Sequence, residues 1–377
     1  MTRNRIQFQK GLSEAQFVHL YGDEEKCRAL VTAWRWPGGF RCPRCKGSAY
    51  CLVSERRLFQ CNACHHQASP TAGTIFDSTK LPLTVWFRAM YLITQTKQGI
   101  SSIELGRRLG TTQTTAWKIK TKLAEVMRIS GEAERLEGRV EMDDAYLGGQ
   151  KSGGKTGRGS PGKRPFIVAV QTDAEGRPQK IKLRRIARFK RKRVKSVAKR
   201  IIAAGATVVT DGLKCFRGVA DAGCTHVAIA TGSGRAAARH PAFKWVNTTL
   251  ANIKTAIVAT YRAVRKKHMV RTLAEFEWRF NHRDNLAAIP LSLRATRYLL
   301  FGQAAPTPTV AHGNVRCNAH PKGATSVCTL FHPRRVPRRT TTMKIISAIV
   351  IVLALMGAIA PASAFDAATF FSDSSPH

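Results

Sequence analysis

Hydrophobic periodicity divides the chain into a helical first part and a mixed second part. Apolar residues recur at helical spacing over residues 13–35, where Ser13 is a candidate N-cap and Cys27 falls on the apolar face as a core residue rather than a ligand. Further helices are expected at residues 81–96, 101–110 and 112–123. Short apolar runs predict strands at residues 49–53, 57–60, 138–147, 165–172, 180–186, 206–210 and 226–230, and helices are expected at residues 216–222, 245–265 and 270–281. The alternation after residue 138 predicts an α/β domain with a mixed sheet.

Four cysteines have the spacing of a zinc ribbon. Cys42 and Cys45 form one CxxC pair, and after fifteen residues Cys61 and Cys64 form a second. Each pair can wrap two thiolates around one face of a tetrahedral ion, and four thiolates leave no open coordination position. The spacing therefore predicts a structural Zn²⁺, with disulfides or idle thiols as the alternative. Three further potential ligands are left outside the site: Cys51, His65 and His66.

The helices at residues 101–110 and 112–123 are joined through a glycine, which is the pattern of a helix-turn-helix. The second helix of such a motif enters the major groove of DNA. Its polar face carries Gln113, Thr114, Thr115, Lys118 and Lys120. An ordinary helical hairpin has the same pattern and is the alternative.

Charge changes this picture more than any other bulk property. The chain has 62 Lys+Arg against 23 Asp+Glu, a formal net charge of +39 and a pI near 10.8. Such a field favours a polyanion, with nucleic acid first and an anionic membrane or a solvated surface as alternatives. Residues 150–164 and 177–200 contain no acid, and the second tract has thirteen Lys/Arg. We expect both tracts to hold DNA backbone, with candidate contacts at Lys190, Arg191, Lys192 and Arg193.

An acidic segment, residues 141–149, stands out against this basic background. It places Asp143 in an expected strand, and Asp211 follows the buried strand at residues 206–210. If these strands are neighbours, the two carboxylates can share divalent metal ions, as in two-metal phosphoryl transfer. Mg²⁺ or Mn²⁺ suits such a site, because a hard ion takes oxygen ligands and keeps waters for the substrate. Taken alone, each aspartate is more typical of a surface or capping residue.

Several motifs in the same order resemble a bacterial insertion-sequence transposase of the group that bears a zinc ribbon. Besides the CxxC pairs, they are Asp143-Asp144-x-Tyr146-x-Gly148-Gly149, Thr210-Asp211-Gly212, Trp245-Val246-Asn247 followed by Lys254, and Glu275-Phe276-x-x-Arg279-Phe280-Asn281. The similarity runs from about residue 15 to about residue 300. It implies a ribonuclease-H-like α/β catalytic domain with a mixed sheet, preceded by the zinc ribbon and the helix-turn-helix.

The resemblance also implies roles for individual residues. Asp143 and Asp211 would be the first two catalytic residues, and the third position falls on Asn247, which is glutamate in many relatives and asparagine in a recognised subgroup. Lys254, on the same helix face, would contact a DNA phosphate. Asparagine offers a metal a neutral oxygen only; a helix cap or a surface amide is the alternative for Asn247. Two residues are candidates to compensate for the missing charge: Asp144 and Glu141.

The implied reaction is hydrolysis of a phosphodiester bond at the transposon end, followed by attack of the new 3′-hydroxyl on target DNA. The implied partners are double-stranded DNA, from the element's ends and from the target, and further protomers in a paired-end complex. We expect the protein in the cytoplasm, associated with the nucleoid. A catalytically inactive, transposase-derived DNA-binding protein is the alternative, because of Asn247 and a C-terminal tail outside the resemblance.

The chain is therefore expected to divide into six segments. They are a helical segment (1–40), a zinc ribbon (41–70), a helix-turn-helix region (81–130), the catalytic domain (138–300), a basic Pro/Thr/Arg-rich tail (304–342) and a final segment (343–377). The final segment has a basic start, an apolar run and an Ala-x-Ala ending, which is typical of a signal peptide but lies at the wrong end. Translation into a neighbouring secreted-protein gene, with Met343 as its start, is one explanation. A tail anchor in contact with a membrane is the other.

Overall fold

The computed structural model describes residues 11–53, 56–96, 98–148, 162–231, 240–261 and 263–286. The tail expected at residues 304–342, the segment at 343–377 and most of the basic tract at 150–164 lie outside these ranges. Within the described part of the chain, no helix is long and apolar enough to cross a membrane.

The first helical stretch is two helices, so the prediction of one helix over residues 13–35 was wrong. Helix α1 (Glu14–Tyr21) begins at Ser13, whose hydroxyl accepts a hydrogen bond from a backbone N–H of the first turn. Helix α2 (Glu24–Arg35) begins again at Asp23, whose carboxylate caps it in the same way. A new cap inside a periodic stretch ends one helix and starts another. Cys27 is fully buried in the core of this region, as predicted.

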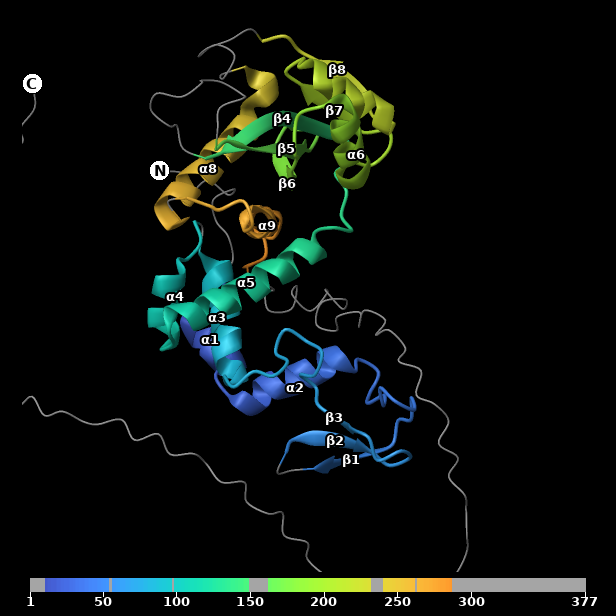
Figure 1. Ribbon diagram of the computed structural model, residues 1–377, viewed down its shortest axis with the longest axis vertical. Coiled ribbons are helices and arrows are strands. Elements are labelled where there is room, and N and C mark those ends of the chain that lie inside the picture. The colour runs from blue at the N-terminus through green and yellow to red at the C-terminus, as the bar shows by residue number, and fades with distance from the viewer. Residues whose placement is uncertain are drawn as a thin grey trace, which may run out of the picture. The chain divides into compact units, whose positions relative to one another are not determined.

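Three further helices share a core with α1 and α2: α3 (Leu83–Gln95), α4 (Ser102–Leu109) and α5 (Gln113–Ser130) (Figure 1). The hydroxyl of Ser101 accepts a hydrogen bond from the first turn of α4, and Gly110 ends that helix at a φ of 64°, in the left-handed region that favours glycine. Thr112 caps α5, which continues to Ser130, beyond the predicted end at residue 123. The two helices and the glycine turn exist as predicted, and DNA binding by α5 stays a prediction.

The zinc-ribbon segment contains a small antiparallel sheet. Its strands are β1 (Tyr50–Val53), β2 (Leu58–Cys61) and β3 (Gln67–Ala68), in the order β1-β2-β3. The short strand β3 was not predicted. The buried core beneath the sheet consists of four small or aromatic side chains: Phe40, Cys42, Cys61 and Ala68.

A five-stranded mixed sheet forms the centre of the second part, and it confirms the predicted α/β class with a mixed sheet. Its strands are β4 (Arg139–Leu147), β5 (Arg164–Thr172), β6 (Pro178–Arg185), β7 (Thr207–Thr210) and β8 (Thr225–Ala228). They lie in the order β6-β5-β4-β7-β8. The pairs β4–β5 and β5–β6 are antiparallel, whereas β4–β7 and β7–β8 are parallel.

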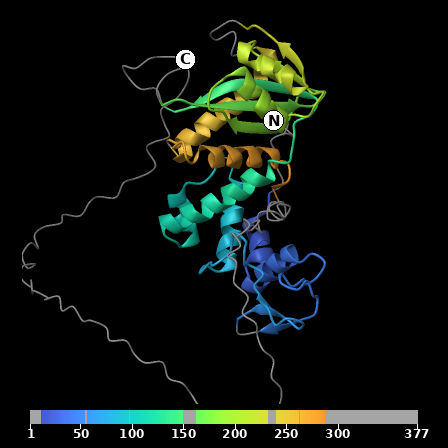
Figure 2. The ribbon, with the colours of Figure 1, turned by 45° about the vertical axis from the view of Figure 1, so that its right-hand side comes forward.

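Helices cover both faces of this sheet (Figure 2). Helix α6 (Arg191–Ile201) and the 3₁₀ helix η2 (Lys214–Ala222) pack on one face, and α8 (Lys244–Tyr261) and α9 (Met269–Asn281) pack on the other. Side chains alternate between the faces along β4, and Ala145 and Leu147 belong to the core under α8 and α9. Glu141 and Asp143 are separated from Ala145 by even numbers of residues, so their side chains point to the same face, toward α8.

Candidate active site

Three carboxylates meet at the end of the contact between β4 and β7. Oxygen atoms of Asp143, Asp144 and Asp211 all lie within 4.8 Å of one another, and all three residues are half-buried. Glu141 pairs with Val209 in the parallel ladder, and Asp143 and Asp211 each follow this last pair by two residues. Paired residues of neighbouring parallel strands project from the same face. The two strands predicted to carry these aspartates are therefore neighbours in the sheet.

The turn after β7 fixes the carboxylate of Asp211. Its Oδ1 accepts a hydrogen bond from the backbone N–H of Leu213 at 3.1 Å, and Gly212 between them has a φ of 80°. Behind the turn, the hydroxyl of Thr210 lies 2.9 Å from Nε2 of His226 on β8. The left-handed conformation of the residue after Asp211 lets the backbone fold back onto the carboxylate. Glycine adopts this conformation without steric cost. The segment Thr210-Asp211-Gly212 is thus a strand end whose turn fixes the orientation of the Asp211 carboxylate.

Glu141 does not have the predicted role of a reserve metal ligand. Its side chain is 2% exposed, and its Oε2 accepts hydrogen bonds from the backbone N–H groups of Trp245 at 2.9 Å and Val246 at 3.0 Å. Its Oε1 accepts one from the Arg139 guanidinium at 3.2 Å. Both oxygens are thus used within the protein, which a buried carboxylate requires. A negative charge at the start of α8 also complements the helix dipole.

The capping bonds to Glu141 bring the first turn of α8, which carries Asn247, against β4. Asn247 directly follows Val246 in the first turn of α8 and is half-buried. The turn is held by a side chain only two residues from Asp143 on the same strand face. Lys254 lies two turns further along α8 and is exposed. The signal for this link was present in the sequence, since Glu141 and Asp143 have the two-residue spacing of one strand face.

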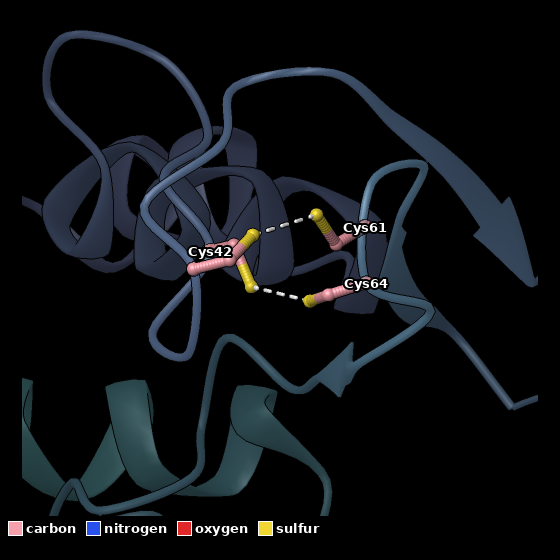
Figure 3. A group of neighbouring side chains, drawn as sticks. Cys42, Cys61 and Cys64 are labelled. Atoms are coloured by element: carbon pink, nitrogen blue, oxygen red, sulfur yellow. Dashed lines mark hydrogen bonds between the residues drawn. The ribbon is translucent and has the colours of Figure 1, made fainter. Parts of the chain in front are cut away.

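The four cysteines of the CxxC pairs form a second cluster, and their sulfur atoms all lie within 4.8 Å of one another. Sγ of Cys42 is 3.6 Å from Sγ of Cys64, and Sγ of Cys45 is 3.4 Å from Sγ of Cys61. Sulfurs around a tetrahedral zinc at about 2.3 Å are roughly 3.8 Å apart, so the cluster fits that ion. Figure 3 shows the sulfurs of Cys42, Cys61 and Cys64 pointing toward a common centre.

Backbone groups of the two CxxC turns favour thiolates at this site. Burial opposes ionisation of Cys42, but N–H groups of Cys45 and Arg44 donate to its sulfur and lower its pKa to about 6. The N–H of Cys64 lowers the pKa of Cys61 in the same way. The pKa of Cys45 is raised to about 12, because the neighbouring thiols outweigh the N–H of Gly47. Zinc is bound by thiolates, so binding of the ion would release the proton that Cys45 retains without it.

The predicted DNA-contacting residues of α5 differ in their exposure. Gln113, Thr114 and Lys118 are exposed, and Thr115 is half-buried next to the cap. Lys120 does not belong to this face: it is 7% exposed, and its ammonium donates to the carbonyl of Ile100 and pairs with a buried glutamate. The helix pattern alone does not predict the burial of Lys120. Buried cations are rare unless they are paired, and the partner, Glu275, lies far along the chain.

The basic tract at residues 177–200 also divides. Lys190, Arg191, Lys192 and Arg193 are exposed at the start of α6, and Arg191 pairs with Asp221 at 2.6 Å. Phe189 contacts Tyr146 of β4, with ring centroids 5.7 Å apart, so this helix start lies at the same end of the sheet as the carboxylates.

Two cations of that tract are not available to DNA. Lys182 is fully buried and pairs with Glu277 at 3.1 Å, and Arg184 pairs with the same carboxylate. Glu277 also accepts a hydrogen bond from the backbone N–H of Leu183 at 2.8 Å. These contacts fasten α9 to β6, which corrects the prediction that the whole tract holds DNA backbone.

Family models match the two parts of the chain that contain these sites. Residues 135–281 match the family described as ISXO2-like transposase domain, and residues 22–67 match the transposase zinc-ribbon domain. An uncharacterized protein in the transposable element ISH50 of Halobacterium salinarum is 24% identical over 133 residues, which cover 34% of this chain and 44% of that protein. The chain thus matches less than half the length of that relative. The crystal structure of a pre-cleavage Mos1 transpososome aligns at 9% identity with a TM-score of 0.21, over 53% of this chain and 74% of that one.

Proposed function

Because the chain belongs to the insertion-sequence transposases that bear a zinc ribbon, we propose that it cuts DNA at the ends of its element and joins the new 3′ ends to target DNA. The observation that carries this proposal is the convergence of Asp143, Asp144 and Asp211 at one edge of the sheet. The strand order, with β5 antiparallel and β4, β7 and β8 parallel, supports a ribonuclease-H-like catalytic domain.

The cluster fits a hard divalent cation. It offers only oxygen donors, as Mg²⁺ or Mn²⁺ prefers, and ligands on opposite sides of a Mg²⁺ ion are about 4.2 Å apart. Separations within 4.8 Å are therefore close to those needed around one or two ions. The cation would activate the attacking oxygen and neutralise phosphate charge. We assign Asp143 and Asp211 as its principal ligands and Asp144 as a further one.

The remaining residues would hold the DNA. Asn247 would offer a neutral oxygen to the cation or to the scissile phosphate; the bond between Val246 and Glu141 in the same helix turn supports this role. Lys254 and the exposed start of α6 would contact phosphates on either side of the cut. Exposed polar residues at the start of α5 would read the end sequence. Two ends brought together would require at least two protomers.

Cleavage of a linear DNA fragment that carries the element's ends, with Mg²⁺ present, tests the proposal. Asp143→Asn and Asp211→Asn should each lower the cleavage rate by at least about 10²-fold, because several kcal/mol of charge stabilisation depend on the ion. Binding of the same fragment should change less than about twofold, since these residues serve chemistry rather than affinity. Asp284→Asn, an exposed carboxylate just after α9, is the matched control. Cleavage that neither substitution changes would leave a DNA-binding protein without this nuclease chemistry.

A further inference from the structure

A cavity of about 450 Å³ lies between α5 and the segment that runs from the end of α8 into α9. It is lined by residues of α4 and α5 on one side and by residues 260–275 on the other, with residue 262 outside the described chain. None of the residues assigned above to the carboxylate cluster takes part in it. Its volume is that of a small-molecule site, which falls between about 300 and 1,000 Å³.

Paired charges fix the floor of this cavity. The ammonium of Lys120 is 3.7 Å from Oε2 of Glu275, and the hydroxyl of Tyr261 donates to the same oxygen at 2.8 Å. The ammonium also lies 4.3 Å from the centroid of the Tyr261 ring. Breaking such a buried set leaves an uncompensated charge, so the contacts hold α5, α8 and α9 in a fixed relation. The cavity therefore has a preformed shape.

An aromatic ring stands at its mouth. Trp117 is 40% exposed, and of the chain's six tryptophans, all of which the structure describes, it alone is exposed. Its ring meets His268 edge to face, with centroids 5.5 Å apart and planes at 84°. Ile103, 57% exposed, extends the apolar surface from the α4 side. The contact with His268 fixes the indole while a large part of it stays open to a ligand.

The charge around the cavity is positive. Arg265 and Lys267 are exposed on its rim, and Arg271 is half-buried and paired with Glu125 at 2.8 Å. Among the described lining residues the one carboxylate is Glu275, which the floor already uses. Arg265 and Lys267 form no ion pair with the residues that the structure describes. An exposed aromatic ring beside such cations is the combination that binds single-stranded nucleic acid, through stacking and phosphate contacts.

We propose that this cavity holds one unpaired nucleotide of the DNA that α5 binds, with its base stacked on Trp117 and its phosphates on Arg265 and Lys267. The inference rests on the proposed function, because it assumes that α5 holds the transposon end. Gln113, at the start of α5, lines the same cavity, so the nucleotide would come from the duplex at that helix. A paired duplex is too large for a cavity of about 450 Å³, because the duplex is wider than its own major groove, which is about 12 Å across.

Equilibrium binding of the full chain to two duplexes tests the proposal. Both carry the element's end sequence, and one has a single additional unpaired nucleotide. The wild type should bind the second duplex about tenfold more tightly, the scale of one stacked base. Trp117→Ala should remove that gain, Trp117→Phe should keep most of it, and both should bind the paired duplex like the wild type.

Substitution of neighbouring cations distinguishes binding in the cavity from general attraction between the basic surface and DNA. Arg265→Ala and Lys267→Ala should reduce the gain from the unpaired nucleotide. Lys266→Ala should leave the gain intact, because Lys266 lies between them but is not among the described residues that line the cavity. Any loss from Lys266→Ala should be equal for the two duplexes.

Two results would overturn the proposal: equal binding of both duplexes by the wild type, or an undiminished gain in Trp117→Ala. If Trp117→Ala does not fold, the comparison of Arg265→Ala with Lys266→Ala decides in its place. Failure of the proposed function gives a different outcome, namely no binding or cleavage of the paired end. A protein that cleaves the paired end but shows no gain from the unpaired nucleotide contradicts the cavity alone.

Discussion

The two candidate metal sites of this chain are built in opposite ways. The cysteine site takes its ligands from two turns within residues 42–64, and two of its four cysteines are fully buried. The carboxylate site takes its ligands from β4 and from the end of β7, and it remains half-exposed. The first site replaces a core that its segment lacks, whereas the second is placed on a core that already exists. A metal should therefore matter for folding at the first site and for chemistry at the second.

The largest expected effect is the loss of zinc. Structural zinc contributes on the order of 10–16 kcal/mol, far more than the four buried residues of the ribbon core can supply. Cys42→Ser should therefore unfold the ribbon and leave the β4–β8 sheet intact. Hydrogen exchange would locate the unfolding, and native mass spectrometry would count zinc per chain.

Cys51→Ser is the control for zinc binding, because Cys51 is exposed on β1 and outside the cysteine cluster. It should retain one zinc and normal protection from exchange. Full zinc content in Cys42→Ser, or loss of protection in the β4–β8 sheet on zinc removal, would contradict the separation of the two sites.

The next effect tests how the carboxylate site depends on its surroundings. Glu141→Ala should lower the free energy of unfolding by about 1–3 kcal/mol, because one buried and one partly buried N–H group at the start of α8 lose their acceptor. It should also lower cleavage, since the Asn247 turn loses its anchor, while Glu141→Gln keeps an acceptor and should lose less. Denaturant unfolding and cleavage measure the two effects. Glu137→Ala is the control, because Glu137 is exposed and lies four residues before Glu141. Normal cleavage by Glu141→Ala would show that Glu141 does not support the carboxylate site.

The same contrast explains what the sequence could predict. The cysteine cluster was predictable, because each CxxC turn alone brings two thiols to one side of a common centre and the two turns are close in the chain. The pairing of Asp143 with Asp211 was predictable only as far as two apolar strands can be expected to be neighbours. The capping role of Glu141 depends on a helix that begins at residue 244, far along the chain, and the local sequence shows only a carboxylate close to two aspartates.

The burial of two lysines could also not be predicted from the sequence. Lys120 and Lys182 occur in basic, polar stretches, and nothing local distinguishes them from exposed neighbours such as Lys118. Their partners, Glu275 and Glu277, lie on α9, which is remote in the chain. The helix break at Asp23 is a different case: the sequence contains the capping residue, but the helical spacing of apolar residues continues across it.

A smaller effect is expected from Asn247. A carboxylate in its place should lower the Mg²⁺ concentration needed for half-maximal cleavage by about tenfold, which corresponds to about 1.4 kcal/mol of added ligand charge. Asn247→Asp should therefore lower this concentration and Asn247→Ala should raise it, whereas zinc content stays at one per chain. Asn252→Ala, exposed on the same helix, is the control. Equal Mg²⁺ requirements in all four proteins would place Asn247 outside the metal site.

The smallest effect concerns acid, which should lower the stability of the fold through His226 on β8. Burial, followed by the charge of Arg217, lowers the pKa of His226, which lies 2.9 Å from Thr210 behind Asp211. The unfolded chain then binds a proton more readily than the folded one, so stability is complete above the unfolded pKa, near 6.5, and falls as the pH drops below it. Urea unfolding of the wild type at pH 7.5 and pH 5.5 should show this loss, and His226→Gln should show less of it. His65→Gln on the ribbon is the control; it should keep the wild-type pH dependence, and a reduction as large as that in His226→Gln would place the acid effect outside the sheet.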